Sequence, residues 1–408
     1  MNQKLTATEE LLATMSAIGI DPQGGLTRLL FDESWKQAQE TLRARFEEAG
    51  LQASYDAAGN LIGTIKGTQK PEENIMTGSH VDTVRNGGTL DGQYGILAGF
   101  LAIQRLIEKH GAPKRSLSVI SFAEEEGSRF PFAFWGSKNL IGSVERSLLK
   151  DTVDQQGISF AQAMHNAGFD FDAPPSAPRT DITAFVEAHI EQGAVLEHLE
   201  KQVGVVTAIT GQKRYNVRLV GEANHAGTTP MPMRKDALEG AARIMVTLID
   251  EAKKLGDPLV LTFGKLEPKP NIVNVVPGEV NFTVDTRHPD QEALNSFAQY
   301  VETTIQNIAY RANLQVTIDN WMDEPPVPMD AKLISLLKDS CAQLGIEHHV
   351  MHSGAGHDSQ IMAPHVPTAM LFVPSKQGIS HNPAEDTNME DLLAGIDVLE
   401  AALYHLAY

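Results

Sequence analysis

The feature that most constrains the fold is a strand–helix–strand pattern between residues 74 and 122. Apolar residues recur at helical spacing over residues 96–107, and Gly111 marks the expected end of that helix. A short stretch, 74–78, precedes the helix, and a mostly apolar run, 117–122, follows it. This order is typical of a βαβ unit with a parallel sheet, so the pattern predicts an α/β fold.

A second pattern spans residues 211–324. Strand and helix patterns alternate there in the order β-α-β-β-α-β, which is the ferredoxin-like plan. The expected strands are 215–219, 259–266, 280–285 and 314–318, and the expected helices are 237–255 and 291–312.

The segment 323–328, rich in proline, is expected to be a stiff connector. Beyond it, helix patterns return at 331–344 and 392–406, and a strand pattern returns at 368–373. We therefore expect residues 212–328 to form a domain inserted into another, which comprises residues 1–211 and 329–408.

Charge and cysteine content exclude several classes of function. The formal net charge is −19, which argues against nucleic acid and anionic membrane surfaces as partners. An anionic small substrate stays possible, because a local pocket can be positively charged even though the net charge of the chain is negative. Cys341 is the only cysteine, so an intramolecular disulfide and a thiolate zinc site are excluded. Cys341 lies in a helical pattern and is expected to be a buried apolar residue.

The first residues lack the pattern of a signal peptide. Glu9 and Glu10 stand where its apolar run would be needed, and no apolar stretch in the sequence has the length of a membrane span. We therefore expect a cytoplasmic protein.

Histidines and carboxylates recur beside glycines, mostly after expected strands, where ligands collect in α/β sheets. His80 could bind a metal with Asp82 orienting its other ring nitrogen, or it could be a loop histidine bonded to backbone. Asp91 precedes a helix, where an aspartate is most often a cap. Three adjacent acids, 124–126, would repel each other at the end of a core strand unless a cation compensates them.

Two further segments contribute histidines. His189 follows a strand-like stretch, and His381 follows the expected strand 368–373. Together, His80, Asp91, Glu126, His189 and His381 would supply three imidazoles and two carboxylates, a set that suits zinc or manganese. Two ions bridged by one aspartate would fit a dinuclear hydrolase.

These segments resemble the metal-dependent amidohydrolases of the peptidase M20 superfamily over essentially the whole chain. The stretch His189-Ile190-Glu191-Gln192-Gly193 is similar to the carbamoylase and ureidohydrolase branch. The resemblance implies a mixed-sheet α/β catalytic domain with helices on both faces. It also implies an inserted ferredoxin-like α+β domain for dimerisation or as a lid, and hence a homodimer formed through residues 212–328.

The resemblance also implies roles for the clustered residues. His80 and His189 would hold one divalent ion and Glu126 and His381 the other, with Asp91 between them and Mn²⁺ or Zn²⁺ as the metal. Glu125 would be the general base. The run of three acids permits a shift of one residue, with Glu124 as the alternative. The ending Glu-Glu-Gly-Ser-Arg-Phe matches this branch best with Glu125 and Glu126.

Six other residues are candidates for substrate binding. His225 could polarise the substrate carbonyl, Asn274 could donate a hydrogen bond, and Arg287 could bind a carboxylate through two parallel hydrogen bonds. Apart from the resemblance, His225 and Asn274 are better explained as loop residues bonded to backbone. The resemblance implies that these two residues could serve a partner subunit. Further candidates are Gln192, Gly356 and His357.

The resemblance implies hydrolysis of a carbon–nitrogen bond in an anionic ureido acid. Through their likeness to this branch, the segments 221–230, 321–324 and 352–358 imply allantoate as the substrate. N-carbamoyl-L-amino acids and β-ureidopropionate remain open, and a dipeptidase is disfavoured by His189. A non-catalytic binding protein on the same fold is the alternative from another class.

Overall fold

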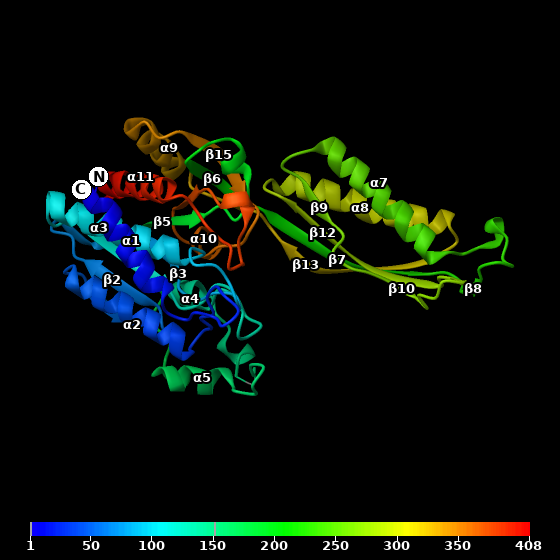
Figure 1. Ribbon diagram of the computed structural model, residues 1–408, viewed down its shortest axis with the longest axis horizontal. Helices are drawn as coiled ribbons and strands as arrows, with labels where there is room; N and C mark the ends of the chain where they lie inside the picture. Colours follow the sequence, from blue (N-terminus) through cyan, green and yellow to red (C-terminus); the bar gives the residue numbers. More distant parts are fainter. Residues whose placement is uncertain (1, 151) are drawn as a thin grey trace. The chain divides into compact units, whose positions relative to one another are not determined.

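The structure is a computed structural model that describes residues 2–150 and 152–408. The chain forms two compact units. Unit 1 comprises Met1–Thr207 and Met329–Tyr408, and unit 2 comprises Ala208–Pro328. Figure 1 labels the elements of both units, each of which is described below by itself.

A mixed sheet forms the centre of unit 1. Among the described residues it has nine strands in the order β1-β2-β4-β3-β5-β16-β6-β14, and β15 pairs with β6. Strands β3, β4, β5 and β16 run parallel to their neighbours in this group, whereas β2 and β6 run antiparallel to theirs. The expected mixed α/β fold is confirmed. The strands are β1 (Gln52–Tyr55), β2 (Leu61–Ile65), β3 (Lys70–His80), β4 (Arg115–Phe122), β5 (Ile182–Ile190), β6 (Val203–Ile209), β14 (Val327–Pro328), β15 (His348–Ser353) and β16 (Thr368–Val373).

The central strands are buried on both faces because their side chains are apolar or small on both sides. In β4, Leu117 and Val119 belong to the larger core, whereas Ile120 and Phe122 belong to a smaller cluster on the opposite face. Helices cover both faces, as expected. Helix α3 (Gln93–His110) contributes to the larger core, and α10 (Asp358–Met362) contributes to the smaller cluster.

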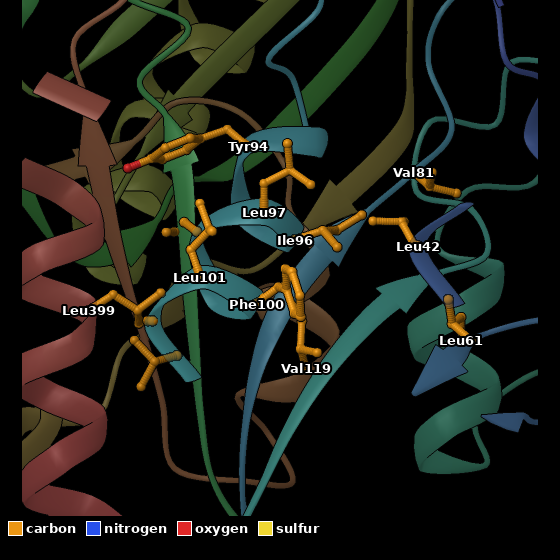
Figure 2. Close-up of a cluster of buried hydrophobic side chains, with 14 of the residues drawn as sticks. Leu42, Leu61, Val81, Tyr94, Ile96, Leu97, Phe100, Leu101, Val119 and Leu399 are labelled. Carbon is orange, nitrogen blue, oxygen red and sulfur yellow. The ribbon is translucent and has the colours of Figure 1, made fainter. Parts of the chain in front are cut away.

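Helix α3 is the expected helix of the βαβ unit, and it begins three residues before the apolar pattern. Its residues Leu97, Phe100 and Leu101 pack among β-strand and helix side chains in the larger core, as Figure 2 shows. The other helices of unit 1 are α1 (Asn2–Ser16), α2 (Glu33–Glu48), α4 (Trp135–Ile141), α5 (Phe160–Ala167), α6 (Val195–His198), α9 (Ala331–Leu344) and α11 (Met389–Ala407), with short 3₁₀ turns η1 (Arg146–Leu148) and η3 (Lys376–Gly378).

Unit 2 has its own sheet and core. Five strands pair in the order β10-β12-β7-β13, with β9 also on β12, and β8 and β11 form a separate pair. Alternate residues of β7 are buried under the two long helices. The elements are β7 (Gly211–Val220), β8 (Asn224–His225), η2 (Met231–Met233), α7 (Ala237–Leu255), β9 (Val260–Thr262), β10 (Leu266–Lys269), β11 (Val275–Val276), β12 (Glu279–His288), α8 (Gln291–Arg311) and β13 (Gln315–Glu324).

Two local expectations are wrong. The stretch 259–266, expected as one strand, is interrupted at residues 263–265, which include Gly264; β9 precedes this break and β10 begins just after it. The stretch 323–328, expected as a connector, is largely strand: β13 runs to Glu324 and β14 pairs with β6. Backbone pairing tolerates these acids because β13 is an edge strand whose side chains are mostly exposed.

Two further expectations concern apolar residues. Cys341 is buried in α9, as its helical pattern indicated. Within the part of the chain that the structure describes, no helix combines the length and apolarity needed to cross a bilayer.

Candidate metal centre

The cluster of candidate ligands lies at one edge of the sheet of unit 1. His80 ends β3, the acids 124–126 follow β4, and His189 is the penultimate residue of β5. These strands are parallel neighbours, so their carboxyl ends meet at a shared edge. Parallel pairing with β5 brings the end of β16, and with it the segment that leads to His381, to the same edge.

Asp91 occupies the middle of this cluster. Its Oδ1 lies 3.4 Å from His189 Nε2 and 4.0 Å from His80 Nε2. Its Oδ2 lies 2.9 Å from His381 Nε2, which in turn lies 3.1 Å from Glu126 Oε1. Two sets of possible metal ligands therefore share Asp91: one with His80 and His189, the other with Glu126 and His381.

Backbone and side-chain contacts orient both buried histidines toward Asp91. His80 Nδ1 lies 3.0 Å from the Asp82 carbonyl oxygen and 3.3 Å from Asp82 Oδ1. His189 Nδ1 lies 3.0 Å from the Ile190 carbonyl oxygen. These contacts at Nδ1 fix the orientation of each ring, so both Nε2 atoms face Asp91.

Asp82 also holds the acidic segment. Its two carboxylate oxygens accept hydrogen bonds from the backbone N–H groups of Glu125 and Glu126, at 3.0 and 3.1 Å. One carboxylate therefore fixes both His80 and the start of the Glu125–Glu126 pair. The orienting role predicted for Asp82 rests on these contacts and stays a prediction.

The three acids of the segment differ in their surroundings. Glu125 and Glu126 form a possible ligand group with His80, whereas Glu124 belongs to no such group among the described residues. Glu124 is 1% exposed, and burial raises its pKa well above the usual range. Burial likewise raises the pKa of Glu125, although the nearby His80 opposes the shift. The structure thus places Glu125, and not Glu124, beside His80.

Opposite charges couple Asp91 to its histidines. Burial would raise the pKa of Asp91, but the hydrogen bond from His381 and the charges of His189 and His80 lower it below its usual value. Hydrogen bonds to Asp91 and Glu126 raise the pKa of His381 to about 10. His381 is the exposed member of the set, with 46% of its side chain accessible, so the cluster opens to solvent on its side.

The donor chemistry fits divalent cations. Buried carboxylates and imidazoles without sulfur are the ligands of zinc and manganese. Glu124 and Asp358 are buried and Glu125 is partly buried, and the repulsion between Asp358 and each glutamate is costly without a compensating cation. Neither carboxylate oxygen of Glu124 has a hydrogen-bond partner within the described ranges.

Three of the expected substrate-binding residues belong to unit 1. Gln192 lies in the cluster: its Nε2 is 3.2 Å from Asp91 Oδ1 and 3.5 Å from His381 Nε2. His357 is buried, with its ring 4.5 Å from that of His189, and its Nε2 is 3.0 Å from Ser353 Oγ. Gly356 precedes it and is exposed.

The other three belong to unit 2. His225 pairs with Val275 in the β8–β11 ladder, and Ala226 N–H donates to the Asn274 carbonyl, so His225 and Asn274 lie together. Arg287 lies elsewhere: it is opposite Gln212 in the β12–β7 pair, and Nε and Nη2 donate to Asp285 at 3.0 and 3.1 Å.

Two buried carboxylates beside the cluster escaped the sequence analysis. Glu385 accepts hydrogen bonds from the backbone of the Asp91 loop, and Glu187 accepts them from Ser79 and Ser359. Glu187 lies two residues before His189 on the same strand, a spacing that could have indicated a shared face. No spacing or motif distinguishes Glu385.

Comparison with known proteins bears on this cluster. The chain is 50% identical over 402 residues to an allantoate amidohydrolase of Escherichia coli (strain K12), covering 98% of each chain. It is 44% identical to an allantoate amidohydrolase of Bacillus subtilis (strain 168), covering 100% of this chain and 99% of the relative. A solved amidase of the hydantoinase/carbamoylase family from Burkholderia multivorans has a TM-score of 0.93 at 33% identity, covering 99% and 98%.

The fold, these relatives and a cluster able to hold metal ions define the protein as a hydrolase. It belongs to peptidase family M20/M25/M40, whose family model matches residues 72–405.

Proposed function

We propose that this hydrolase cleaves a ureido carbon–nitrogen bond of allantoate with two divalent metal ions. The observation that carries the proposal is that two sets of metal-type ligands share the carboxylate of Asp91. The names of the two relatives at 50% and 44% identity support allantoate as the substrate. The products would be ureidoglycine, ammonia and carbon dioxide.

The ligand positions follow from the geometry of the two sets. His80 and His189 would hold one ion, Glu126 and His381 the other, and Asp91 would contact both. Zn²⁺ or Mn²⁺ suits these donors. When bound, such ions polarise a carbonyl oxygen and lower the pKa of water toward neutrality.

Glu125 is proposed as the general base. It lies beside His80 and Glu126, and burial raises the pKa of its carboxyl group, which favours proton uptake near neutral pH. Its carboxylate would accept a proton from the attacking water as the new carbon–oxygen bond forms. Glu125 would then return that proton to the departing nitrogen as the carbon–nitrogen bond breaks.

Six residues are proposed to bind the substrate. Arg287 would bind the carboxylate in two parallel hydrogen bonds, and His225 would donate to the oxyanion that forms on the ureido carbon, a contact worth about 3–4 kcal/mol. The remaining four would line the substrate: Gln192, Asn274, Gly356 and His357.

The geometry of unit 2 supports a homodimer. Arg287 lies opposite Gln212 at one end of the β12–β7 pair, and the chain leaves β7 toward His225 at the other end, where Glu279 lies opposite Val220. Arg287 lies eight positions after Glu279 along the strand, or about 26 Å at 3.3 Å per residue. One chain's Arg287 and His225 are too far apart to hold one small ureido acid, so we propose that His225 and Asn274 serve the substrate of a partner subunit.

A direct assay of ammonia release tests the proposal. Purified protein would be given allantoate or one of several N-carbamoyl-L-amino acids, with and without a chelator. We expect rapid release from allantoate, loss with the chelator and recovery with Mn²⁺ or Zn²⁺. Faster turnover of an N-carbamoyl amino acid would favour the carbamoylase activity that the name of the Burkholderia multivorans amidase suggests. Activity indifferent to the chelator would reject the metal ions.

A further inference from the structure

Glu385 is a buried carboxylate that the mechanism above does not use. It lies four residues after His381 and is 6% exposed. It has the geometry of a connection between two loops, because its two oxygens accept hydrogen bonds from segments about 300 residues apart in the sequence.

One oxygen holds the loop of Asp91. Glu385 Oε1 accepts from the backbone N–H of Leu90 at 2.8 Å and of Asp91 at 3.0 Å. The other oxygen holds the loop of His381: Oε2 accepts from Ser380 Oγ at 2.9 Å. A single side chain therefore fixes the backbone at Asp91 and the residue directly before His381.

Gly88 provides the space that this connection needs. A Cβ atom at residue 88 would lie 2.0 Å from Glu385 Oε1 and 2.1 Å from its Cδ, far inside contact distance. The backbone at residue 88 is not in the left-handed region, so the requirement for glycine is one of space and not of conformation. The loop can approach Glu385 only because residue 88 has no side chain.

We propose that Glu385 is a positioning residue that sets the separation of Asp91 and His381, and thereby the affinity of the metal ion that these two residues and Glu126 would hold. The inference rests on the proposed function. Glu385 would touch neither substrate nor metal. It would act through the 2.9 Å approach of His381 Nε2 to Asp91 Oδ2 that its hydrogen bonds maintain.

Four variants of the full-length protein test this role: Glu385→Ala, Glu385→Gln, Gly88→Ala and the double variant Gly88→Ala/Glu385→Ala. The readouts are the affinity for Zn²⁺ and Mn²⁺ by chelator competition, the melting temperature of the metal-free protein, and kcat and KM for allantoate. Metal affinity separates a positioning role from a merely structural one, because the latter would lower stability alone.

We expect Glu385→Ala to weaken binding of the more weakly held ion about 10–100-fold, the usual effect of losing a residue that orients ligands. Glu385→Gln should recover most of the affinity, because its amide oxygen can accept the two backbone N–H bonds and its amide group can donate to Ser380 Oγ. Gly88→Ala should resemble Glu385→Ala. In the double variant, removal of the Glu385 carboxyl group leaves room for the methyl group at residue 88. The losses of metal affinity in the two single variants should therefore not add.

Asp330→Ala is the matched control. Asp330 also accepts two backbone N–H bonds, from Lys332 and Leu333 at the start of α9, and neither residue belongs to the cluster. Losing this cap should cost about 1 kcal/mol of stability and leave metal affinity unchanged.

Unchanged metal affinity in Glu385→Ala, or additive losses in the double variant, would overturn the positioning role. The wild-type protein separates this failure from failure of the proposed function. If wild type binds metal tightly and hydrolyses allantoate while the variants also do, only the inference about Glu385 fails. If wild type does neither, the proposed function itself fails.

Discussion

At the scale of single residues, the members of the cluster hold one another in place, and Asp91, His80 and His189 are buried. Asp91 lies within 4.0 Å of three histidine Nε2 atoms, and Asp82 fixes one of these rings and the acidic segment together. Because each group is held by a neighbour, small changes of volume or charge should have large and specific effects.

Glu125→Gln should leave metal binding near normal and lower kcat about 10²–10⁴-fold, because the amide cannot accept the proton of the attacking water. Steady-state ammonia release and metal analysis measure both quantities. Glu124→Gln is the matched comparison at the adjacent acid. A larger loss of kcat in Glu124→Gln than in Glu125→Gln would contradict the assignment of the base.

Gly92→Ala should weaken metal binding at least about 10-fold, because the new Cβ would lie 2.4 Å from Cε1 of the ligand candidate His80. Metal affinity by chelator competition checks this. Gly111→Ala is the control: it lies at the other end of α3 with a similar positive φ, 73° against 65°, and no atom lies within 4 Å of its added Cβ. Equal losses of metal affinity in both variants would attribute the effect to backbone strain and not to His80.

At the scale of helices and strands, the spacing of apolar residues provided most of the information about where the elements begin and end. Helix α7 has the bounds that its apolar spacing predicts. Helix α3 begins three residues before the predicted start. The first turn was missed because Gln93, Tyr94 and Gly95 are buried but do not form an apolar pattern in the sequence. The end of β13 was missed because an exposed edge strand has no burial pattern to reveal it.

The candidate ligands could be expected at one edge because they follow neighbouring parallel strands. The position of Glu385 could not be predicted, because it depends on how closely the backbone at Gly88 approaches after folding. The same holds for the separation of His225 from Arg287 along unit 2, which follows from strand register and not from composition.

Asp285 of β12 is paired with Arg214 of β7 and with Arg287 of its own strand, and these contacts should depend on pH. Burial would raise the pKa of Asp285, but the two guanidinium groups lower it below the ordinary value of 3.8. The ionised carboxylate therefore stabilises the fold above about pH 3.8, and this contribution is lost as the pH falls through the lowered pKa.

Amide hydrogen exchange of β7 and β12 in wild type and Asp285→Asn measures this dependence. Wild type should show the higher opening free energy at neutral pH, and the difference should shrink once the pH falls below about 4. A difference that grows on acidification would contradict the sign of the pKa shift.

At the scale of the whole molecule, the proposed pairing of two copies makes each complete set of substrate contacts depend on both. In unit 2, Arg287 lies at one end of the β12–β7 pair, and His225 lies in the separate β8–β11 pair, which follows the other end of β7. A partner that supplies His225 would explain why two residues with complementary chemistry lie so far apart in one chain.

Co-expression of Glu125→Gln and His225→Ala chains tests this pairing. Each variant alone should be nearly inactive. In a mixed dimer, one of the two substrate sites has a wild-type Glu125 and a wild-type His225 from the partner. Random pairing makes about half of the dimers mixed, so about a quarter of wild-type activity should return. If a mixture shown to contain mixed dimers recovers no activity, His225 acts with the Glu125 of its own chain and not with that of the partner.

The strand order of unit 1 has a consequence for synthesis of the chain. Strand β16 lies between β5 and β6, although about 180 residues separate it from β5 and about 160 from β6 in sequence. On the ribosome, both flanking strands are made long before the strand that separates them, and until residue 373 emerges each has an open hydrogen-bonding edge. A nascent chain must keep that gap from closing or from recruiting a strand of another molecule, which makes the late stage of translation the point of greatest aggregation risk.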